Sequence, residues 1–464
     1  MCSRVRFSAA LLAVVVTYCL MAFSSPARAA ENATLQNVVL DTGGATYRMK
    51  TIVFVGSNLT QAQLSALFDK NSSEALIKRF SSLSAASVTI PELIIERPLT
   101  NGIHSTTMLD VVFRDISGGK AATMTVKGGS MKTPGDTATF GAMNAKDLDI
   151  ALMASLYTED ANSALRPILK EFNWEALQYK TDKGGTFRFD RITSPGVQMR
   201  AGALKTPSAK PDDKTPKYAF PAAGSVTFSG VSMEFPDSSA KGEMHKWTIR
   251  EIVLASDQLR GDLPSAIKLV INDWSAAVGP NSPQGLRDLG YESVLASLRF
   301  EGIWNEPANE FIVKAVAADF AQIGSVTISA TLGNVKREMF SGNGEAIAAA
   351  AQGVTAKILA VAFENKGLYE RAVAMLSKRD GSKPEDVRKK FELIVAKTAP
   401  ILLGSSSNAK IITKGISDFL AKPGTLEITA KSKNSAGVPL SDFKPVGISP
   451  APSIDKLDVT TAVK

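Results

Sequence analysis

The sequence predicts an α+β fold, in which antiparallel β-rich meander sheets carry helices packed on one face and the chain is divided into two sequential parts. Apolar and polar residues alternate over most of the chain, as they do in antiparallel strands with one buried face. Helical spacing of apolar residues interrupts this alternation, mainly after Gly344. A Pro-rich stretch at 205–221 is typical of a linker and separates the two parts.

Residues 1–29 have the features of a secretory signal peptide. Arg4 and Arg6 precede an apolar stretch from Ala9 to Phe23, and Ala27-Arg28-Ala29 supplies small residues at a cleavage site. We therefore expect an exported protein from which this segment is removed.

The composition after the signal peptide indicates a bacterial periplasmic protein. Both cysteines, Cys2 and Cys19, lie within the signal, and a large secreted eukaryotic protein without cysteine is unusual. Of the 53 Lys and Arg residues three lie in the signal, so the 45 Asp and Glu leave a net charge of +5. This charge favours anionic surfaces such as lipid headgroups, but without basic clusters interleaved with aromatics it does not indicate nucleic acid as a partner.

The first part, residues 31–204, is expected to be an α+β domain. A strand-like stretch is followed by a helical one, in which Thr60 with Gln63 and Asn71 with Glu74 fit capping boxes. Further strands follow, and "AKDLDIALMASLYTED" and "SALRPILKEFNW" have the spacing of short helices.

The second part, residues 222–445, is expected to be a β-meander with a helical insertion at 344–422, followed by a flexible tail at 446–464. The helices should cover the apolar face of the strands in 286–335. The side chains expected to be buried there are Leu298, Phe300, Phe311, Val313, Val326 and Ile328, in contact with Leu376, Phe391 and Ile394.

Four stretches carry a resemblance to a known group of proteins: "LTQAQLSALFDKNSSEALIKRFSSLSAASVTIPEL", "LRDLGYESV", "FENKGLYERAVAM" and "DFLAKPGTLEI". Together they resemble a family of uncharacterised exported alphaproteobacterial proteins, to which no chemistry is assigned. The layered strands also resemble, more loosely, the AsmA-like proteins of the cell envelope. That resemblance implies the handling of envelope lipids by a β-rich protein.

The residue types that usually carry chemistry do not form a recognisable set. His104 and His245 lack His or Cys partners at metal-ligand spacing, and the sequence contains neither a nucleophile elbow nor a phosphate-binding loop. Asp147 and Asp149 form a D-x-D pair, which we interpret as a helix start rather than a metal site. We therefore expect no catalytic, cofactor-binding or metal-ligating residues and no cofactor. The four tryptophans are interpreted as core and rim residues: Trp174, Trp247, Trp274 and Trp304.

These observations favour a non-catalytic periplasmic envelope protein that binds lipid or assists envelope assembly. Its expected partners are an envelope lipid or another envelope protein, with peripheral membrane contact and no transmembrane helix after signal cleavage. One alternative is a structural or protein-interaction module. A less favoured one is a hydrolase of wall polymer or polysaccharide that uses carboxylates alone.

Overall fold

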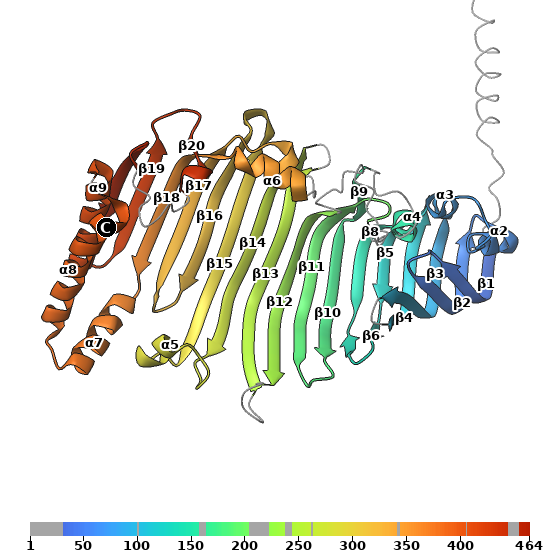
Figure 1. The fold of residues 1–464 in the computed structure, drawn as a ribbon. Helices are drawn as coiled ribbons and strands as arrows, with labels where there is room; N and C mark the ends of the chain where they lie inside the picture. Colours follow the sequence, from blue (N-terminus) through green and yellow to red (C-terminus); the bar gives the residue numbers. More distant parts are fainter. Residues whose placement is uncertain are drawn as a thin grey trace, which may run out of the picture.

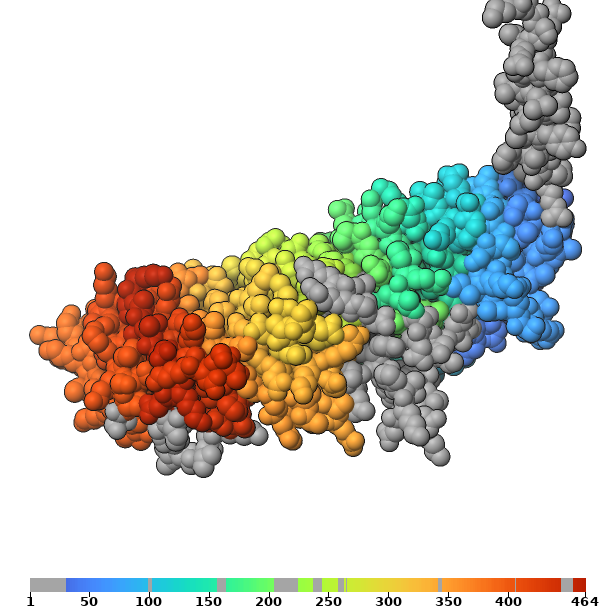
Figure 2. All heavy atoms as spheres, turned by 90° about the horizontal axis from the view of Figure 1, so that it is seen from above, coloured from blue at the N-terminus to red at the C-terminus, as the bar shows by residue number. Residues whose placement is uncertain are grey.

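The computed structural model describes residues 31–99, 102–156, 164–203, 222–236, 244–260, 263–340, 344–404, 406–443 and 454–464. Within these residues, all 21 strands join one antiparallel sheet, which gives the molecule an elongated shape (Figures 1 and 2). The predicted α+β, β-rich fold class is confirmed.

The first half of the sheet runs from β1 to β11, and most neighbours in the chain are neighbours in the sheet. Two pairs of short strands, β5 with β6 and β7 with β8, each take the place of one long strand. The bounds are β1 Glu31–Asp41, β2 Thr46–Ser57, β3 Ala85–Leu99, β4 Gly102–Ser117, β5 Lys120–Val126, β6 Gly128–Lys132, β7 Thr137–Phe140, β8 Met143–Asp149, β9 Arg166–Leu169, β10 Glu171–Lys180 and β11 Thr186–Met199.

The second half is a simple meander of long strands from β12 to β19, closed at its edge by β21. The bounds are β12 Ala222–Pro236, β13 Met244–Arg260, β14 Leu263–Ala277, β15 Ser293–Asn305, β16 Glu310–Phe320, β17 Gly324–Gly333, β18 Thr355–Asn365, β19 Thr425–Ser432, β20 Val438–Pro439 and β21 Leu457–Val463.

Helices lie mainly near the two ends of this sheet (Figure 1). Near the amino-terminal end are α2 Gln61–Ala66, α3 Leu76–Ser81 and α4 Ile150–Ser155. The others are α5 Gln284–Asp288, α6 Gly344–Gln352, α7 Leu368–Asp380, α8 Pro384–Leu403 and α9 Ser407–Ala421, with short 3₁₀ turns at η1 Glu306–Ala308, η2 Arg337–Phe340 and η3 Leu440–Phe443. No helix among the described residues is long and apolar enough to cross a membrane.

The two expected parts are not separate sheets. Strands β11 and β12 pair directly, for example at Ile192 and Phe228, so the hydrogen-bonded ladder continues from one part to the other. The linker predicted at 205–221 lies outside the described residues, as does the signal peptide predicted at 1–29. Backbone pairing therefore crosses the boundary between the two expected sequential parts, and the sheet is continuous there.

The structure confirms one of the predicted helix starts and contradicts another, and it replaces one predicted helix by strands. The capping box at Thr60 and Gln63 is confirmed at the start of α2. The second one is wrong, because α3 begins after Ala75 without a side-chain cap. The stretch "SALRPILKEFNW" is not a helix but contributes β9 and the start of β10, where pairing with β11 outweighs the helical spacing.

Repeated bulges bend the strands. Non-glycine residues with positive φ occur inside β4, β8 and β14 at Asp110, Asp147 and Asp273, and aspartate tolerates this conformation better than most residues. Each of these carboxylates pairs with a cation: Lys127, Lys170 and Arg250 respectively. At Asp273 the register between β14 and β15 shifts by one residue, and such a bulge bends a strand and increases its local twist.

The tail expected at 446–464 is not flexible throughout. Residues 457–463 form β21, which pairs with β19 from Leu457 opposite Ser432 to Val463 opposite Leu426. The side chain of Asn408 in α9 fixes the approach to this strand, since it donates hydrogen bonds to the carbonyl oxygens of Ile454 and Leu457. The sequence does not predict this short strand, because seven residues beside a Pro-rich stretch carry little pattern of their own.

Candidate functional site

One face of the sheet is apolar from strand to strand. Directly paired residues of antiparallel strands point to the same face, so the register identifies which side chains share it. One row crosses eight adjacent strands from β12 to β19: Val226, Leu254, Leu269, Phe300, Val316, Ile328, Val361 and Ile428. The next row does the same: Phe228, Ile252, Ile271, Leu298, Ala318, Val326, Phe363 and Leu426. We call this surface the apolar face.

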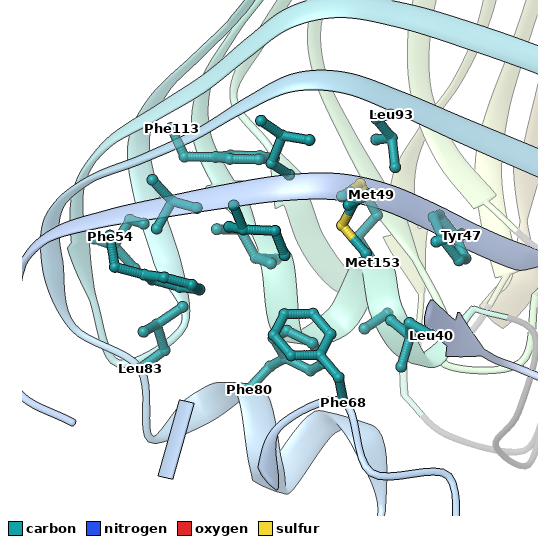
Figure 3. A pocket seen from close by; sticks show the side chains of 16 residues that line it. Leu40, Tyr47, Met49, Phe54, Phe68, Phe80, Leu83, Leu93, Phe113 and Met153 are labelled. Atoms are coloured by element: carbon teal, nitrogen blue, oxygen red, sulfur yellow. The ribbon is translucent and has the colours of Figure 1, made fainter. Parts of the chain in front are cut away.

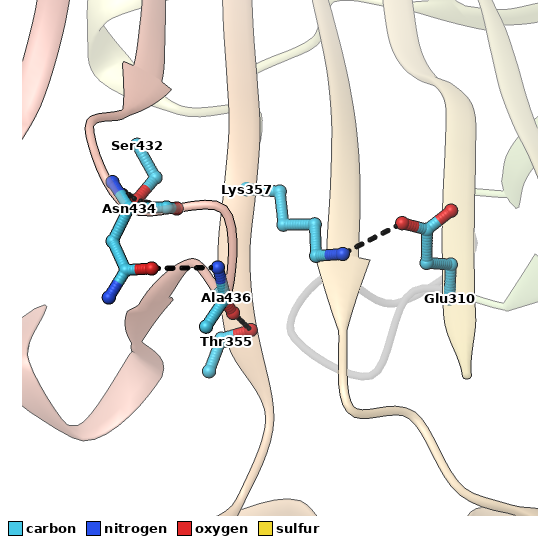
Figure 4. Close-up of polar contacts among 6 residues, drawn as sticks. All are labelled: Glu310, Thr355, Lys357, Ser432, Asn434 and Ala436. Carbon is cyan, nitrogen blue, oxygen red and sulfur yellow. Dashed lines mark hydrogen bonds and ion pairs between the residues drawn. The ribbon is translucent and has the colours of Figure 1, made fainter. Parts of the chain in front are cut away.

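The opposite face carries the charged side chains. Glu301 in β15 pairs with Arg299 at 2.9 Å and with Lys268 of β14 at 3.7 Å. Lys357 of β18 reaches across β17 to Glu310 of β16, with 2.9 Å between Nζ and Oε1 (Figure 4). This polar face is suited to water, and the contrast with the apolar face follows from the alternation of side chains between the bulges of each strand.

At the amino-terminal end, the apolar face is covered. Helices α2, α3 and α4 lie over it, and Phe68 and Phe80 point toward strand residues such as Met49 and Phe113 (Figure 3). A cavity of about 110 Å³ remains between helices and strands, and its lining is almost wholly apolar. This volume corresponds to roughly four water molecules, and a site without polar partners does not hold ordered water well.

At the carboxy-terminal end, α9 covers the same face. Phe419 meets Phe363 of β18 edge to face, with 5.4 Å between ring centroids. Gly415 brings the helix against β21, because a Cβ at that position would come within 2.8 Å of Thr461 Cβ. Ile412 packs against the small cluster that includes Val459.

Between these two ends the apolar face has little cover. Strand residues on it remain exposed in β13, β15, β16 and β18, with exposed fractions of 40% for Leu298 and 43% for Val316. Local cover comes from η2, where Phe340 packs on Trp304 with ring centroids 4.7 Å apart. The exposed apolar side chains of this open section are Trp247, Leu254, Leu298, Val316 and Leu359.

This exposure corrects the expectation that helices 344–422 cover the meander. None of the six residues expected to be buried there is buried: Leu298, Phe300, Phe311, Val313, Val326 and Ile328. Helices α7 to α9 do form an insertion between β18 and β19, as expected. However, Leu376 and Phe391 pack within the helices against Tyr369, Val373 and Val387, and Ile394 is exposed. The helices pack with one another and over the last strands rather than across the meander.

An aromatic row borders the open section. Five rings on five adjacent strands, β10 to β14, meet edge to face with centroid separations of 4.9–6.2 Å. All five belong to the apolar face by register. They are Tyr179, Phe187, Phe235, Trp247 and Trp274. Trp247 and Trp274 are far apart in the sequence, so only strand register shows that they are neighbours.

The other singled-out residues have structural roles. Asp149 caps α4, accepting a hydrogen bond from the backbone N–H of Leu152 at 2.8 Å. Asp147 forms an ion pair with Lys170 at 2.9 Å, so the two aspartates of the D-x-D pair have different structural roles. The remaining two tryptophans are core residues: Trp304 is buried, and Trp174 packs against Phe140 and Phe172.

The two histidines lie in strands far apart along the sheet. His104 is part of β4, and His245 is exposed in β13. Within the described residues, no group of three or more His, Cys, Asp or Glu side chains is arranged to hold a metal ion.

Among the described residues, the three carboxyl groups with shifted pKa values all have a lowered pKa. Tyr179 donates a short hydrogen bond to Asp136, and this bond holds the pKa of that carboxyl below its usual value. Arg299 lowers the pKa of Glu301, and Arg379 lowers that of Asp380. A glycosidase needs one carboxyl group whose pKa is raised so that it can act as an acid. These three groups do the opposite, so they do not support a carboxylate-based hydrolase.

Comparison with models of protein families gives a partial match. A family model described as an uncharacterized protein matches residues 317–463, which is less than half of the chain. The matched segment contains β17 to β21 and helices α6 to α9. No curated protein matches the chain.

Proposed function

We propose that this protein is a non-catalytic lipid-binding protein of the bacterial envelope, which holds acyl chains along the open section of its apolar face. The single observation that carries the proposal is that rows of apolar side chains cross β12 to β18 in register and are not buried there, with Leu254, Leu298 and Val316 exposed. The periplasmic location rests on the signal-peptide pattern in residues 1–29.

The energetic argument begins with the exposed side chains. Fully burying a Leu or Val side chain stabilises the fold by about 1.5–3 kcal/mol. Leu298 and Val316 in the open section remain 40% and 43% exposed, so part of this free energy is not gained on folding. Large apolar patches rimmed by polar residues usually mark binding surfaces. A ligand that covers the open section would recover this energy without any rearrangement of the sheet.

The shape and chemistry of the surface favour hydrocarbon chains. Seven strands from β12 to β18, spaced about 4.8 Å apart, span about 30 Å. Backbone N–H and C=O groups in these strands pair within the ladder, so the surface offers a ligand mainly side-chain contact. A long, flexible, apolar molecule matches such a surface, whereas a small polar ligand would find few partners on it.

The test begins with protein isolated from its native source. An organic extract analysed by mass spectrometry should contain acyl lipids. Delipidated full-length protein should then bind cis-parinaric acid, whose fluorescence rises in apolar surroundings. Protein that carries no lipid and does not raise the fluorescence of this probe would overturn the proposal.

Two substitutions in β15 give a matched comparison of the two faces. Leu298→Asp places a charge on the apolar face and should weaken probe binding about tenfold, because the probe must then cover a carboxylate. Leu295→Asp is the control, since Leu295 is 42% exposed but pairs with Ser275 on the polar face. Equal losses in the two variants would place the binding surface elsewhere.

A further inference from the structure

We propose that helix α8 docks the carboxy-terminal end of the molecule onto an anionic lipid bilayer. This proposal rests on the proposed lipid-binding function, because docking would bring the protein to a source of lipid. It rests, however, on different residues, so each idea can fail without the other.

Helix α8 carries a row of exposed apolar side chains. Val387, near its start, is buried against Tyr369 and Val373 of α7, with Phe391 packed beside them. Leu393, Ile394 and Ile401 are exposed, with fractions of 57%, 54% and 62%. Together with Lys390 and Lys397 they follow the spacing i, i+3, i+4, i+7 and i+11 from residue 390, which places all five on one side of a helix.

Charge distribution identifies the partner as anionic. Residues 368–422 contain eleven Lys and Arg against six Asp and Glu, a net charge of +5. From residue 31 to the end, the rest of the chain has 39 of each, so these helices carry the whole charge excess. Lys389 and Lys397 are exposed beside this row, while Lys390 also pairs with Asp380 at 3.7 Å. Apolar side chains flanked by lysines are typical of helices that lie in the surface of an anionic membrane.

The position of α8 suits this role. Helices α7, α8 and α9 occupy one extremity of the elongated molecule, and the cavity with its covering helices lies toward the other (Figures 1 and 2). Arg371 of α7 lies over the ring of Tyr291, 4.5 Å from its centroid, which ties the helices to the loop before β15. Docking through α8 would therefore place one end of the sheet at the bilayer, with the open section leading away from it.

The experiment measures sedimentation of the full chain with vesicles of phosphatidylcholine alone or with 30% phosphatidylglycerol. We expect binding to the anionic vesicles and about tenfold weaker binding to the neutral ones. Leu393→Glu and Ile401→Glu should each reduce binding about tenfold, and both should keep the wild-type melting temperature because these side chains are exposed.

The matched control is Ile103→Glu in β4, since Ile103 is 63% exposed and distant along the chain. It should bind vesicles like the wild type. The docking proposal is overturned if the full chain binds neither kind of vesicle, if the control loses as much binding as Ile401→Glu, or if α8 proves to bind a protein instead. Binding of cis-parinaric acid without vesicles reports on the open section alone and should be unchanged in Leu393→Glu.

Discussion

The amino-terminal end and the open section of the sheet share one pattern but differ in what covers it. In both regions apolar residues alternate along the strands and align between them. At the amino-terminal end, helices cover this face and Phe54 is 1% exposed. In the open section the equivalent positions, such as Leu298 and Val316, are exposed. Alternation therefore predicts which face is apolar, but not whether the chain itself covers it.

Whether helices cover the apolar face also determines whether its side chains contribute to stability or to ligand binding. A side chain under the helices stabilises the fold because it has left water on folding. A side chain in the open section has only part of its apolar surface removed from water on folding, so a ligand can bury the rest. The same residue type thus contributes mainly to folding in one region and mainly to recognition in the other.

The largest expected effect is at the covered end. Phe54→Ala should lower the free energy of unfolding by about 3–5 kcal/mol, since it removes a large buried side chain that already borders a cavity. Leu298→Ala, in the open section, should cost less than about 1 kcal/mol. Urea denaturation followed by circular dichroism measures both. Comparable losses would show that the open section is as closely packed as the covered end.

A smaller effect is expected where α9 holds the last strand. Asn408→Ala leaves the carbonyl oxygens of Ile454 and Leu457 without their donor and should cost about 1–3 kcal/mol. Hydrogen exchange should also become faster in residues 457–463. Asn272→Ala is the control: its side chain is only partly buried, bonds to Glu251, and should change stability by less than about 1 kcal/mol. If the strand keeps its protection in Asn408→Ala, this contact does not fix the covered carboxy-terminal end.

The smallest effect concerns the polar face of the open section. Hydrogen bonding and charge from Arg299, with Lys268 and Lys314, lower the pKa of Glu301 below its ordinary value of 4.5. A carboxyl whose pKa is lowered in the folded state adds stability above its unfolded pKa and loses it as the pH falls through the folded value. Glu301→Gln should therefore cost less than about 1 kcal/mol at pH 7, because its partner Arg299 is 54% exposed and solvent weakens the ion pair.

The pH dependence of the stability lost in Glu301→Gln tests the role of the charge more directly than its size at pH 7. The difference between Glu301→Gln and the wild type should shrink as the pH drops below 4.5, where Glu301 takes up a proton. Urea midpoints between pH 7 and pH 3 measure it. Glu292→Gln, at an exposed position just before β15, is the control for the loss of one carboxylate. A constant difference across this range would mean that ionisation of Glu301 does not contribute.

By itself, the sequence determined the local features whose cause lies within a few residues. Alternation in 293–333 predicted β15, β16 and β17, and the pairing of Thr60 with Gln63 predicted the start of α2. The helical insertion between β18 and β19 was also predicted, since helical spacing depends only on neighbours along the chain. The lack of a catalytic set remains a prediction.

Only the tertiary structure decided how these elements combine. It joined β11 to β12 across the expected boundary and brought Trp247 beside Trp274. It also placed α7 to α9 at one end, so that Leu298 stayed exposed. These outcomes depend on strand register and on which apolar surfaces pack against each other. Both involve residues that are far apart in the chain. An apolar side chain has the same local pattern whether a helix, a lipid or water lies above it, so its pattern alone cannot identify its neighbour.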